Sequence, residues 1–317
     1  MLDIRGLSVS LGHNGPPVLQ QIDLHAAAGE ILGVVGESGA GKSVTGAAVS
    51  GLLTPPLVKS QGEIWFEGSR IDTHGPRQMR QLRGAGIGMV FQDPLAALNP
   101  VFTIGHQLTQ TIATHNTLGR AELHDRAVSL LSEVGIPAPS ERLGSYPHEF
   151  SGGMRQRVVI AMALAGNPRL IIADEPTTAL DVSIQAQILV LLRGLVRRLG
   201  VAILLITHDM GVIAEAADRV MVLYAGRVVE EGATAEVLTH PRHPYTSGLV
   251  GSIPEIGAKL DRLPQIPGAM PSVGEGIPGC AFYPRCGDAM PDCGHKQPVP
   301  ERLEHGITVA CWARTAR

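Results

Sequence analysis

The sequence predicts an α/β fold that is organised around one glycine-rich loop. The loop, Gly36–Ser43, reads GESGAGKS and stands between an apolar segment of strand type, Ile31–Val35, and a segment of small and apolar residues that can be helical, Val44–Leu53. Further along the chain, other short apolar segments also end in polar residues, as the strands of a parallel sheet do where they meet a ligand. Beyond residue 240 the composition changes: eleven of the 23 prolines lie in the last 77 residues, which predicts a second, smaller domain.

The loop has the pattern G-x-x-x-x-G-K-[ST], in the strand–loop–helix context that makes this pattern a phosphate site. Its glycines allow a tight turn that aims successive backbone N–H groups at one anion, and the following helix adds the positive end of its dipole. Lys42 would reach the β- and γ-phosphates, and the Ser43 hydroxyl would ligate Mg²⁺. The sequence therefore predicts a nucleoside triphosphate site. Its expected residues are Gly36, Glu37, Ser38, Gly39, Ala40, Gly41, Lys42, Ser43 and Val44.

Before this loop, two segments alternate in the manner of antiparallel strands. These are residues 2–10 and Val18–Leu24, and the polar turn Gly12–Pro17 joins them. They predict an antiparallel sheet at the N-terminus that leads into the Ile31–Val35 strand. After the loop, Gly62–Gly68 is predicted to be another strand between glycines.

Two later apolar segments end in residues suited to phosphate chemistry. Ile87–Phe91 ends at Gln92, whose amide can ligate Mg²⁺ or place a water molecule. Leu170–Ala173 leads directly into Asp174 and Glu175, and acidic residues at the carboxyl end of a buried strand face the same crevice as the loop. Asp174 would hold Mg²⁺ through water, and Glu175 is placed to take a proton from the attacking water.

Two further features point to the same site. The apolar strand Val201–Ile206 is followed by His208, which could touch the γ-phosphate and fix the geometry of the attacking water. Ser151 can cap a helix that begins with Gly152 and Gly153, and these glycines would let a phosphate approach the helix amides closely. The sequence thus predicts two helix ends that hold one nucleotide from both sides.

The composition excludes several classes of protein. Of the 317 residues, 44% are hydrophobic and 17% are charged, so the chain can bury a sizeable core, and a net charge of −3 gives no reason to expect a nucleic-acid partner. The N-terminal residues lack a basic region followed by an apolar one, and no run of about 18 apolar residues occurs. We therefore expect a cytoplasmic protein that does not itself cross a membrane.

The four cysteines all follow residue 279 and are spaced C-x₅-C-x₆-C-x₁₇-C. Four thiolates suit a [4Fe–4S] cluster or tetrahedral zinc, and in a cytoplasmic protein such grouping favours metal or redox chemistry over disulfides. The spacing is wider than the C-x₂-C pairs usual in zinc sites, so we expect a cluster, with zinc and free structural thiols as alternatives. We expect its role to be structural rather than in electron transfer. The cysteines are Cys280, Cys286, Cys293 and Cys311.

In this order, the motifs resemble those of the nucleotide-binding subunit of an ABC transporter, over about residues 1–240. GESGAGKS matches the Walker A motif, and LIIADEP, Leu170–Pro176, matches Walker B with its catalytic glutamate. The resemblance implies a P-loop NTPase fold with a RecA-like mixed sheet, an N-terminal antiparallel β subdomain and a helical subdomain at about residues 93–165. It also adds Asp181 to the nucleotide site. The other matches are MVFQDP, ending at Gln92–Pro94 (Q-loop), FSGGMRQR, Phe150–Arg157 (signature), TTALD, Thr177–Asp181 (D-loop), and ITHDM, Ile206–Met210 (switch histidine).

The resemblance narrows to the ATPase subunits of dipeptide and oligopeptide permeases. The stretches FQDPLAALNP, HPRHPYTSGLVGSIP and GCAFYPRC carry it. It implies ATP hydrolysis with Mg²⁺ in a head-to-tail dimer with a similar or identical chain. It also implies docking on two transmembrane permease subunits at the cytoplasmic face of the membrane. A substrate-binding protein would deliver the solute to these permease subunits. Finally, it implies a C-terminal domain, residues 241–317, whose cysteines are associated with an iron–sulfur cluster.

Two departures from the family pattern bear on the nucleotide site. The signature begins with Phe150 where the family has leucine and carries Met154 where the family has glutamine. Neither change removes the Ser-Gly-Gly that meets phosphate. The position at which the family stacks an aromatic ring on adenine falls at His13, and a histidine stacks more weakly than a larger ring. Because of its position, we expect His13 to contact the base.

Three alternatives to a transport subunit carry less support. A soluble ABC ATPase of DNA maintenance would insert a long coiled coil or a zinc hook before the signature, yet only about 60 residues separate Gln92 from Ser151. A translation-factor ABC protein would carry two ATPase cores in one chain. A purely regulatory nucleotide sensor would have no need of both Glu175 and His208.

Overall fold

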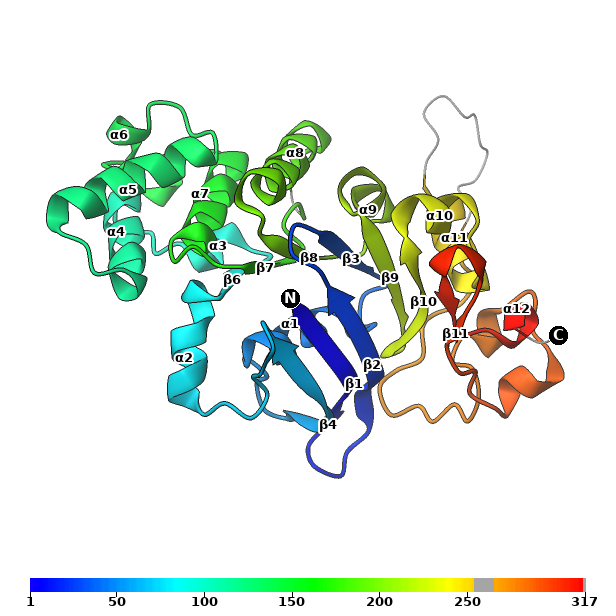
Figure 1. The fold of residues 1–317 in the computed structure, drawn as a ribbon. Helices are drawn as coiled ribbons and strands as arrows, with labels where there is room; N and C mark the ends of the chain where they lie inside the picture. Colours follow the sequence, from blue (N-terminus) through cyan, green and yellow to red (C-terminus); the bar gives the residue numbers. More distant parts are fainter. Residues whose placement is uncertain (179, 254–264, 316–317) are drawn as a thin grey trace. The chain divides into compact units, whose positions relative to one another are not determined.

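The computed structural model describes residues 1–178, 180–253 and 265–315. Their contacts divide the chain into two compact units. The first unit contains both ends of the chain, Met1–Ala26, Ile31–Asp72 and Leu205–Arg317, and the second contains Ala27–Glu30 and Thr73–Leu204. The phosphate loop and the C-terminal region therefore belong to the same unit (Figure 1). The domain boundary expected near residue 240 stays a prediction.

An antiparallel sheet begins the first unit, as the alternation of the N-terminal residues predicts. Its strand order is β2-β1-β4-β5, and β1 pairs antiparallel with both β2 and β4. Apolar side chains of β1 and β2, among them Ile4, Leu7 and Ile22, are fully buried. The strands are β1 (Leu2–Leu11), β2 (Pro17–Ala26), β4 (Leu57–Phe66) and β5 (Ser69–Arg70).

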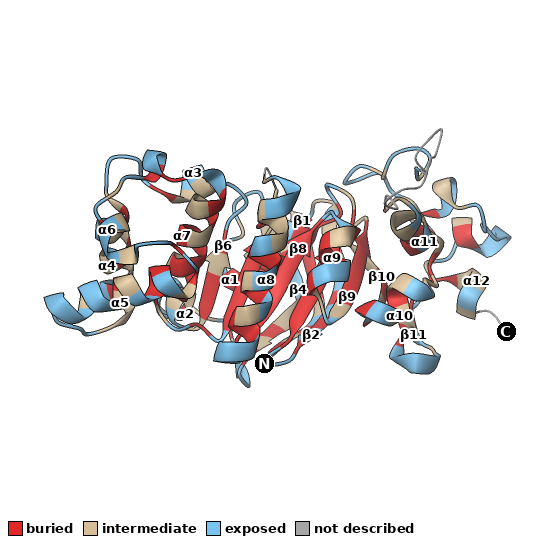
Figure 2. Cartoon of the chain, turned by 90° about the horizontal axis from the view of Figure 1, so that it is seen from above, coloured by how far each residue is buried: buried red, intermediate tan, exposed pale blue. Residues whose placement is uncertain are grey.

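A second, mixed sheet carries the phosphate loop. Within the first unit its order is β11-β12-β10-β9-β3, with β3 parallel to β9 and β9 antiparallel to β10. Strand β3 reads ILGVV and is buried over its whole length, as a strand covered on both faces should be, and β9 is buried over most of its length (Figure 2). The strands are β3 (Ile31–Val35), β9 (Arg219–Tyr224), β10 (Arg227–Ala233), β11 (Glu301–Arg302) and β12 (Thr308–Val309). The helices of this unit are α1 (Lys42–Ser50), α9 (Met210–Ala216), α10 (Thr234–Thr239), α11 (Pro244–Gly251) and α12 (Trp312–Thr315).

The second unit is mainly helical and contains the parallel strand pair β6 and β7. Helices α4 and α5 carry the periodic apolar residues of the sequence, and Leu108, Ile112, Leu130 and Leu131 are all buried. Strand β8 (Ala202–Thr207) starts in this unit and ends in the first. The other elements are α2 (Pro76–Ala85), β6 (Ile87–Val90), α3 (Pro94–Ala97), α4 (Ile104–His115), α5 (Arg120–Glu133), α6 (Pro139–Arg142), α7 (Gly152–Leu164), β7 (Leu170–Asp174) and α8 (Val182–Leu199).

The C-terminal region has little regular structure but a distinct aromatic core. Beyond α11, the regular elements of its described part are 3₁₀ turns, two short strands and α12. The rings of Tyr245 and Phe282 pack against Tyr224 at the end of β9, with centroids 4.6 and 5.2 Å from the Tyr224 ring. Prolines remove backbone hydrogen-bond donors from this region, so side-chain packing has a larger part in fixing it to the rest of the first unit.

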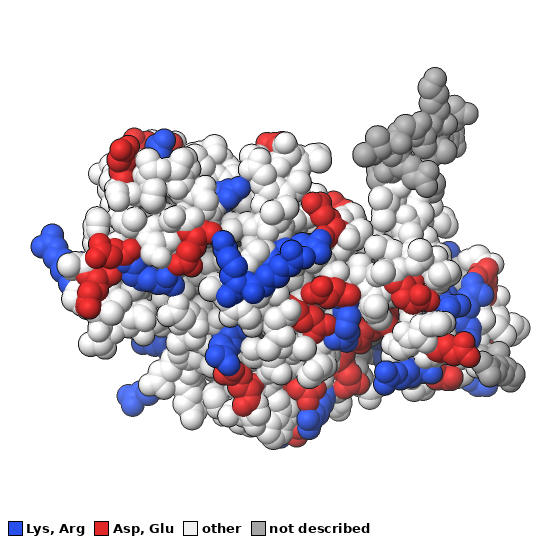
Figure 3. All heavy atoms as spheres, turned by 45° about the horizontal axis from the view of Figure 1, so that its top comes forward, with Lys and Arg blue, Asp and Glu red and all other residues white. Residues whose placement is uncertain are grey.

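Two surface properties bear on the partners of the chain. No helix in the described part of the chain is both long enough and apolar enough to cross a membrane. On the face drawn in Figure 3, acidic side chains are interspersed with basic ones. That face therefore carries both signs of charge, in line with the small net charge of the sequence.

Candidate nucleotide-binding site

The phosphate loop joins β3 to α1, as the sequence predicts, and its glycines are required where they stand. Gly39 and Gly41 have φ angles of +85° and +103°, in the left-handed region that favours glycine. At Gly36 an added Cβ would lie 2.2 Å from the carbonyl oxygen of Leu223, so no larger residue fits. Helix α1 has no side-chain cap at its N-terminus, and such a helix end favours a bound anion.

Lys42 is buried against the backbone of this loop. Its ammonium group donates to the carbonyl oxygens of Gly36 at 2.7 Å and Glu37 at 3.0 Å, and the residue is only 6% exposed. A buried ammonium group is tolerated only where acceptors surround it. The two bonds therefore keep one positive charge in place inside the loop.

Side chains from the C-terminal half of the first unit hold the loop, a feature that the sequence analysis missed. The backbone N–H of Glu37 donates to the Tyr245 hydroxyl at 2.8 Å. The Arg285 guanidinium donates to both carboxylate oxygens of Glu37, at 3.0 and 3.1 Å, and to the Tyr224 hydroxyl at 3.2 Å. Tyr245 and Arg285 lie 208 and 248 residues from Glu37 in the sequence, so no local pattern could reveal these contacts.

The ionisation of these groups keeps the contact intact near neutral pH. Burial raises the pKa of Tyr245 and of Tyr224, so both hydroxyls stay protonated. Burial alone would lower the pKa of Arg285, but its hydrogen bonds to Glu37 and Tyr224 raise that pKa overall. Arg285 is therefore charged, and with 6% of its side chain exposed its ion pair with Glu37 is largely shielded from solvent.

The two predicted histidines of the first unit lie in exposed positions. His208 directly follows β8. Its neighbour Asp209 caps α9, accepting from the N–H of Gly211 at 2.7 Å, and donates its own N–H to Thr207 Oγ1 at 3.1 Å. These bonds fix the backbone on which His208 stands. His13 is exposed in the turn between β1 and β2, and the roles of both histidines stay predictions.

In the second unit, β7 ends at Asp174, and Glu175 follows it in a strained conformation. The φ angle of Glu175 is +52°, which costs about 1–3 kcal/mol for a residue other than glycine. The residue is 8% exposed, and its carboxylate accepts from the Thr178 hydroxyl at 2.6 Å. Strain of this kind persists where the surrounding structure enforces it, often at active sites. We therefore keep Glu175 as the candidate general base.

Ser151 and Asp181 cap the two helices of the second unit that the sequence assigns to the nucleotide. The Ser151 hydroxyl accepts from a backbone N–H in the first turn of α7 at 3.3 Å, and the Asp181 carboxylate accepts from the N–H of Ile184 in α8 at 2.9 Å. Gly152 is exposed, whereas a Cβ added at Gly153 would lie 2.5 Å from the Ile184 side chain. Helix packing therefore requires Gly153, a reason that the sequence analysis did not foresee.

Gln92 lies in a segment of the second unit with many exposed apolar side chains. It is exposed just after β6, and the following Asp93 caps α3 by accepting from the N–H of Leu95 at 2.8 Å. Exposed apolar side chains that are grouped together often mark an interaction site, so this segment, with four of them, is a candidate contact surface. Its exposed apolar residues are Phe91 (48%), Leu95 (58%), Val101 (70%) and Phe102 (45%).

The four cysteines gather in the C-terminal region without forming disulfides. Burial raises the pKa of Cys280 to about 11, and negative charge on the other three cysteines adds to this shift, so the four side chains lie within electrostatic reach of one another. Metal ligation requires thiolates, whereas a raised pKa favours the protonated thiol. Among the described residues, no group of three or more His, Cys, Asp or Glu side chains is arranged to hold a metal ion. The structure thus gives no support to the predicted iron–sulfur cluster, nor to zinc.

Comparison with known proteins identifies the family. A profile for the family described as ABC transporter matches residues 19–178, which include the phosphate loop, Gln92, Ser151 and Glu175. The chain belongs to the ABC transporter family. A second profile, described as the C-terminal region of oligopeptide/dipeptide transporters, matches residues 229–293 of this ABC protein.

Bacterial relatives match the ABC protein almost from end to end. It is 46% identical to a probable peptide ABC transporter ATP-binding protein of Sinorhizobium fredii, over 98% of this chain and 94% of the relative. It is 44% identical to the dipeptide transport ATP-binding protein of Bacillus subtilis, over 100% of this chain and 96% of the relative. An oligopeptide transport ATP-binding protein of the same organism is 45% identical, over 98% and 88%. The resemblance to dipeptide and oligopeptide permease ATPases is confirmed.

Solved structures confirm the fold. One is a dimeric ATP-binding cassette in a post-hydrolysis state with ADP and Pi, which is 27% identical with a TM-score of 0.65 over 74% of this chain and 99% of that one. Another, 30% identical with a TM-score of 0.67 over 75% and 90%, is part of an ABC transporter complex from Clostridium perfringens. The predicted α/β P-loop NTPase fold is therefore confirmed, and the ABC protein is an ATPase. None of these relatives supports the DNA-maintenance or translation-factor alternatives.

Proposed function

We propose that this ABC protein is the ATP-hydrolysing subunit that energises import of dipeptides, oligopeptides or a related small solute through partner membrane subunits. The observation that carries the proposal is the phosphate loop, with Lys42 bonded inside it and an N-terminus of α1 without a side-chain cap beside it. This loop occurs in a chain that is similar over its whole length to peptide-transport ATP-binding proteins. The choice of solute lies with the other subunits.

In the proposed reaction, the loop amides and Lys42 bind the β- and γ-phosphates of ATP. The chain offers Ser43, Gln92 and Asp174 as ligands of Mg²⁺, because hydroxyl, amide and carboxylate oxygens are the groups that Mg²⁺ prefers. Bound there, the metal would neutralise negative charge on the phosphates. The Lys42 ammonium exchanges its two carbonyl partners for phosphate oxygens, which are stronger, charged acceptors.

Glu175 is assigned the role of general base towards the attacking water. Its carboxylate is oriented by the Thr178 hydroxyl at 2.6 Å and is held in one position by the strained backbone. A general base must be fixed within hydrogen-bond reach of the proton that it accepts. His208, on the backbone fixed by Asp209, is assigned the contact to the γ-phosphate.

We assign ATP to the interface of a head-to-tail dimer. One chain supplies the phosphate loop, and the Ser151, Gly152 and Gly153 helix end of the other chain meets the γ-phosphate, with Asp181 close by. The dimeric state of the similar cassette that was solved with ADP and Pi supports this assignment. The second chain can be identical or a paralogue.

We also propose that the protein acts at the cytoplasmic face of the membrane, docked on two transmembrane permease subunits. A substrate-binding protein delivers the solute to these subunits. The exposed apolar segment with Phe91, Leu95, Val101 and Phe102 supports this docking, because a permease contact would bury it. The segment begins beside Gln92. Contact there would couple the state of the γ-phosphate to the permease.

Cells that carry this chain are expected to lose ATP-dependent uptake of a labelled dipeptide when the chain is deleted. Uptake should return with the wild-type chain and not with a Lys42→Met chain, because the latter lacks the charge that holds the phosphates. Uptake of an unrelated sugar, measured in the same cells, is the control. If dipeptide and oligopeptide uptake were unchanged in cells whose chain hydrolyses ATP normally, peptide import would be excluded.

For the cysteines we propose a [4Fe–4S] cluster with a structural role, with zinc as the alternative. What supports it is the gathering of four thiols in one proline-rich region. Because metal ligation requires thiolates, the cluster would have to lower the raised pKa values of Cys280, Cys286 and Cys311. We expect about four iron atoms per chain and a broad visible absorption band in anaerobically purified protein. A colourless sample that contains neither iron nor zinc would show that the thiols are free.

A further inference from the structure

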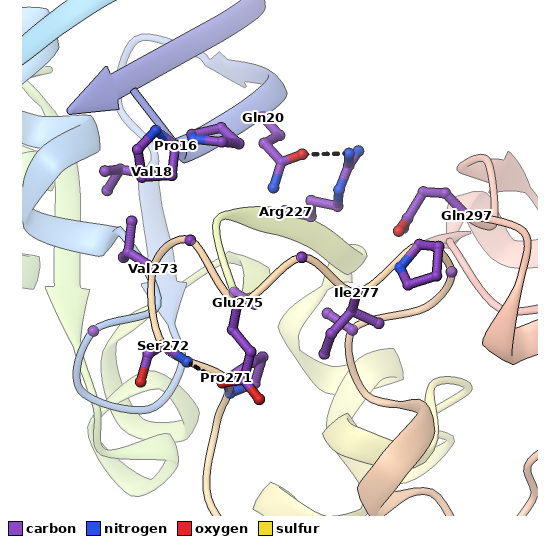
Figure 4. Close-up of a pocket in the computed structure, with 18 residues that line it drawn as sticks. Pro16, Val18, Gln20, Arg227, Pro271, Ser272, Val273, Glu275, Ile277 and Gln297 are labelled. Carbon is purple, nitrogen blue, oxygen red and sulfur yellow. Dashed lines mark hydrogen bonds between the residues drawn. The ribbon is translucent and has the colours of Figure 1, made fainter. Parts of the chain in front are cut away.

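The first unit contains a pocket of about 240 Å³ beside the phosphate loop. Most of its lining comes from four segments: the start of β2 around Val18, the turn between β9 and β10, Gly39 of the phosphate loop, and the C-terminal segment Pro271–Gly279. Ala281 and Gln297 complete it. Figure 4 shows Val273 of the C-terminal segment facing Val18 of β2. The two segments that face each other here are more than 200 residues apart in the sequence, so the pocket is a product of the folded C-terminal region.

We propose that this pocket holds the base and ribose of the bound nucleotide, and that Pro271–Gly279 forms its outer wall. The inference rests on the proposed function, because it requires a nucleotide whose phosphates lie on the loop. Gly39 belongs both to that loop and to the pocket lining. A nucleotide that is held by its phosphates must place its nucleoside next to the loop, and this pocket shares a residue with the loop.

The size and lining of the pocket suit a nucleoside. Pockets for drug-sized ligands measure roughly 300–1,000 Å³, so about 240 Å³ fits a smaller group such as a base with its sugar. Val18 of β2 and Val273 of the C-terminal segment both offer apolar surface to the pocket, against which a flat ring can lie. The described residues that line the pocket include no aromatic residue, and they do not include His13. Contact with aliphatic side chains of two segments would therefore replace stacking on one ring.

Polar groups are placed where a ribose or a base edge needs them. The Arg227 guanidinium donates to the Gln20 side chain at 2.6 Å, and both residues line the pocket. On the C-terminal segment, the carboxylate of Glu275 accepts from the N–H of Ser272 at 3.0 Å. Pockets of this kind combine an apolar lining with a few fixed polar groups that orient the ligand.

The C-terminal wall lies close to the phosphate loop just before its start and is bonded to the loop beyond its end. Before the wall, the Met270 side chain lies 3.2 Å from the position of a Cβ on Gly39. After it, Arg285 forms its ion pair with Glu37 of the loop and donates to the carbonyl oxygen of Pro267 at 2.7 Å. A wall held in this way is already in place before a nucleotide binds, which lowers the entropy cost of binding.

Within the wall, Gly274 brings the backbone close to the start of β2. Its φ angle is +92°, and an added Cβ would lie 3.3 Å from the ring of Pro16. Glycine therefore suits this position, because it tolerates the positive φ angle and has no Cβ that would crowd Pro16. The close approach of the two segments sets the width of the pocket.

The test is a Val273→Asp substitution in the full-length chain, with Val299→Asp as the matched control. Val299 also lies in the C-terminal region, is 66% exposed and does not line the pocket. A carboxylate at position 273 would have to be desolvated against the nucleoside. We expect the Kd for ATP to rise roughly tenfold or more in Val273→Asp, and the Kd for inorganic tripolyphosphate to stay at the wild-type value. Val299→Asp should match the wild type with both ligands, and thermal unfolding shows that both variants are folded.

The outcomes separate this inference from the proposed function. If Val273→Asp binds ATP as well as Val299→Asp does, or binds it more tightly, the C-terminal segment does not form the nucleoside pocket, and the ATPase assignment is untouched. If Val273→Asp loses tripolyphosphate along with ATP, the substitution acts on the phosphate loop instead, which also overturns the inference. If the wild-type chain binds neither ligand in the presence of Mg²⁺, the proposed function fails, and the inference fails with it.

Discussion

A Glu175→Gln chain is expected to hydrolyse ATP more slowly by roughly two to four orders of magnitude, while it still binds ATP. Glutamine has nearly the same size and keeps a side-chain oxygen that can accept the bond which the Thr178 hydroxyl makes at 2.6 Å. Its amide cannot accept the proton of the attacking water. Because ATP then persists in the site, we also expect the closed dimer to accumulate. The kcat at saturating Mg²⁺ and ATP, ATP binding by titration, and the mass of the complex in ATP together measure these effects.

A Glu67→Gln chain is the matched control for this experiment. Glu67 also has a positive φ angle, +49°, and it is exposed in the turn between β4 and β5. The control therefore makes the same chemical change at a similarly strained backbone position. It should leave both kcat and ATP binding unchanged. Equal turnover in the two variants would mean that another residue accepts the proton.

Most of the fold follows from local patterns, because the strands that carry the site are short, apolar and buried. The run ILGVV before the phosphate loop is one such strand, and it becomes the fully buried β3. The periodic spacing of Leu108, Ile112, Leu130 and Leu131 places one face of α4 and one face of α5 in the core. In each case, residues close together in the sequence determine which element forms and which of its side chains are buried.

The contacts that hold the loop could not be predicted in this way. Arg285 and Tyr245 reach Glu37 across 248 and 208 residues, and neither the arginine nor the tyrosine stands in a pattern that indicates phosphate binding. The strain at Glu175 is equally invisible in the sequence, since its φ angle of +52° is imposed by the surrounding structure. The cysteine spacing suggested a metal, but spacing along a chain does not fix the distances between thiols.

Gly153 illustrates how one residue type can be predicted for an incomplete reason. The Ser-Gly-Gly sequence suggested that both glycines open the helix end to a phosphate. In the structure Gly152 is exposed and its phosphate role stays a prediction, whereas Gly153 lets α7 approach the Ile184 side chain of α8. A Gly153 substitution would therefore disturb helix packing before it reported on nucleotide binding, and Ser151 is the better residue at which to test that helix end.

A Lys42→Met chain is expected to bind ATP at least about a hundredfold more weakly than the wild type. Each hydrogen bond to a charged group is worth about 1.5–3 kcal/mol, and the ammonium group can make more than one such bond to the phosphates. Methionine fills nearly the same volume, so the substitution removes the charge without opening a cavity. The Kd for ATP, measured by calorimetric titration with Mg²⁺, reports the effect.

The same substitution also leaves two backbone carbonyl groups of the loop without their donor, and this sets the control measurements. The carbonyl oxygens of Gly36 and Glu37 lose the bonds that Lys42 makes at 2.7 and 3.0 Å, which should lower the free energy of unfolding by a few kcal/mol, about 1–3 for each unpaired group. Binding is therefore measured well below the lowered Tm. Lys296→Ala, at a lysine whose side chain is 64% exposed, should change neither quantity. If folded Lys42→Met bound ATP with the Kd of Lys296→Ala, the buried ammonium would be a structural group of the loop, and the loop amides alone would hold the phosphates.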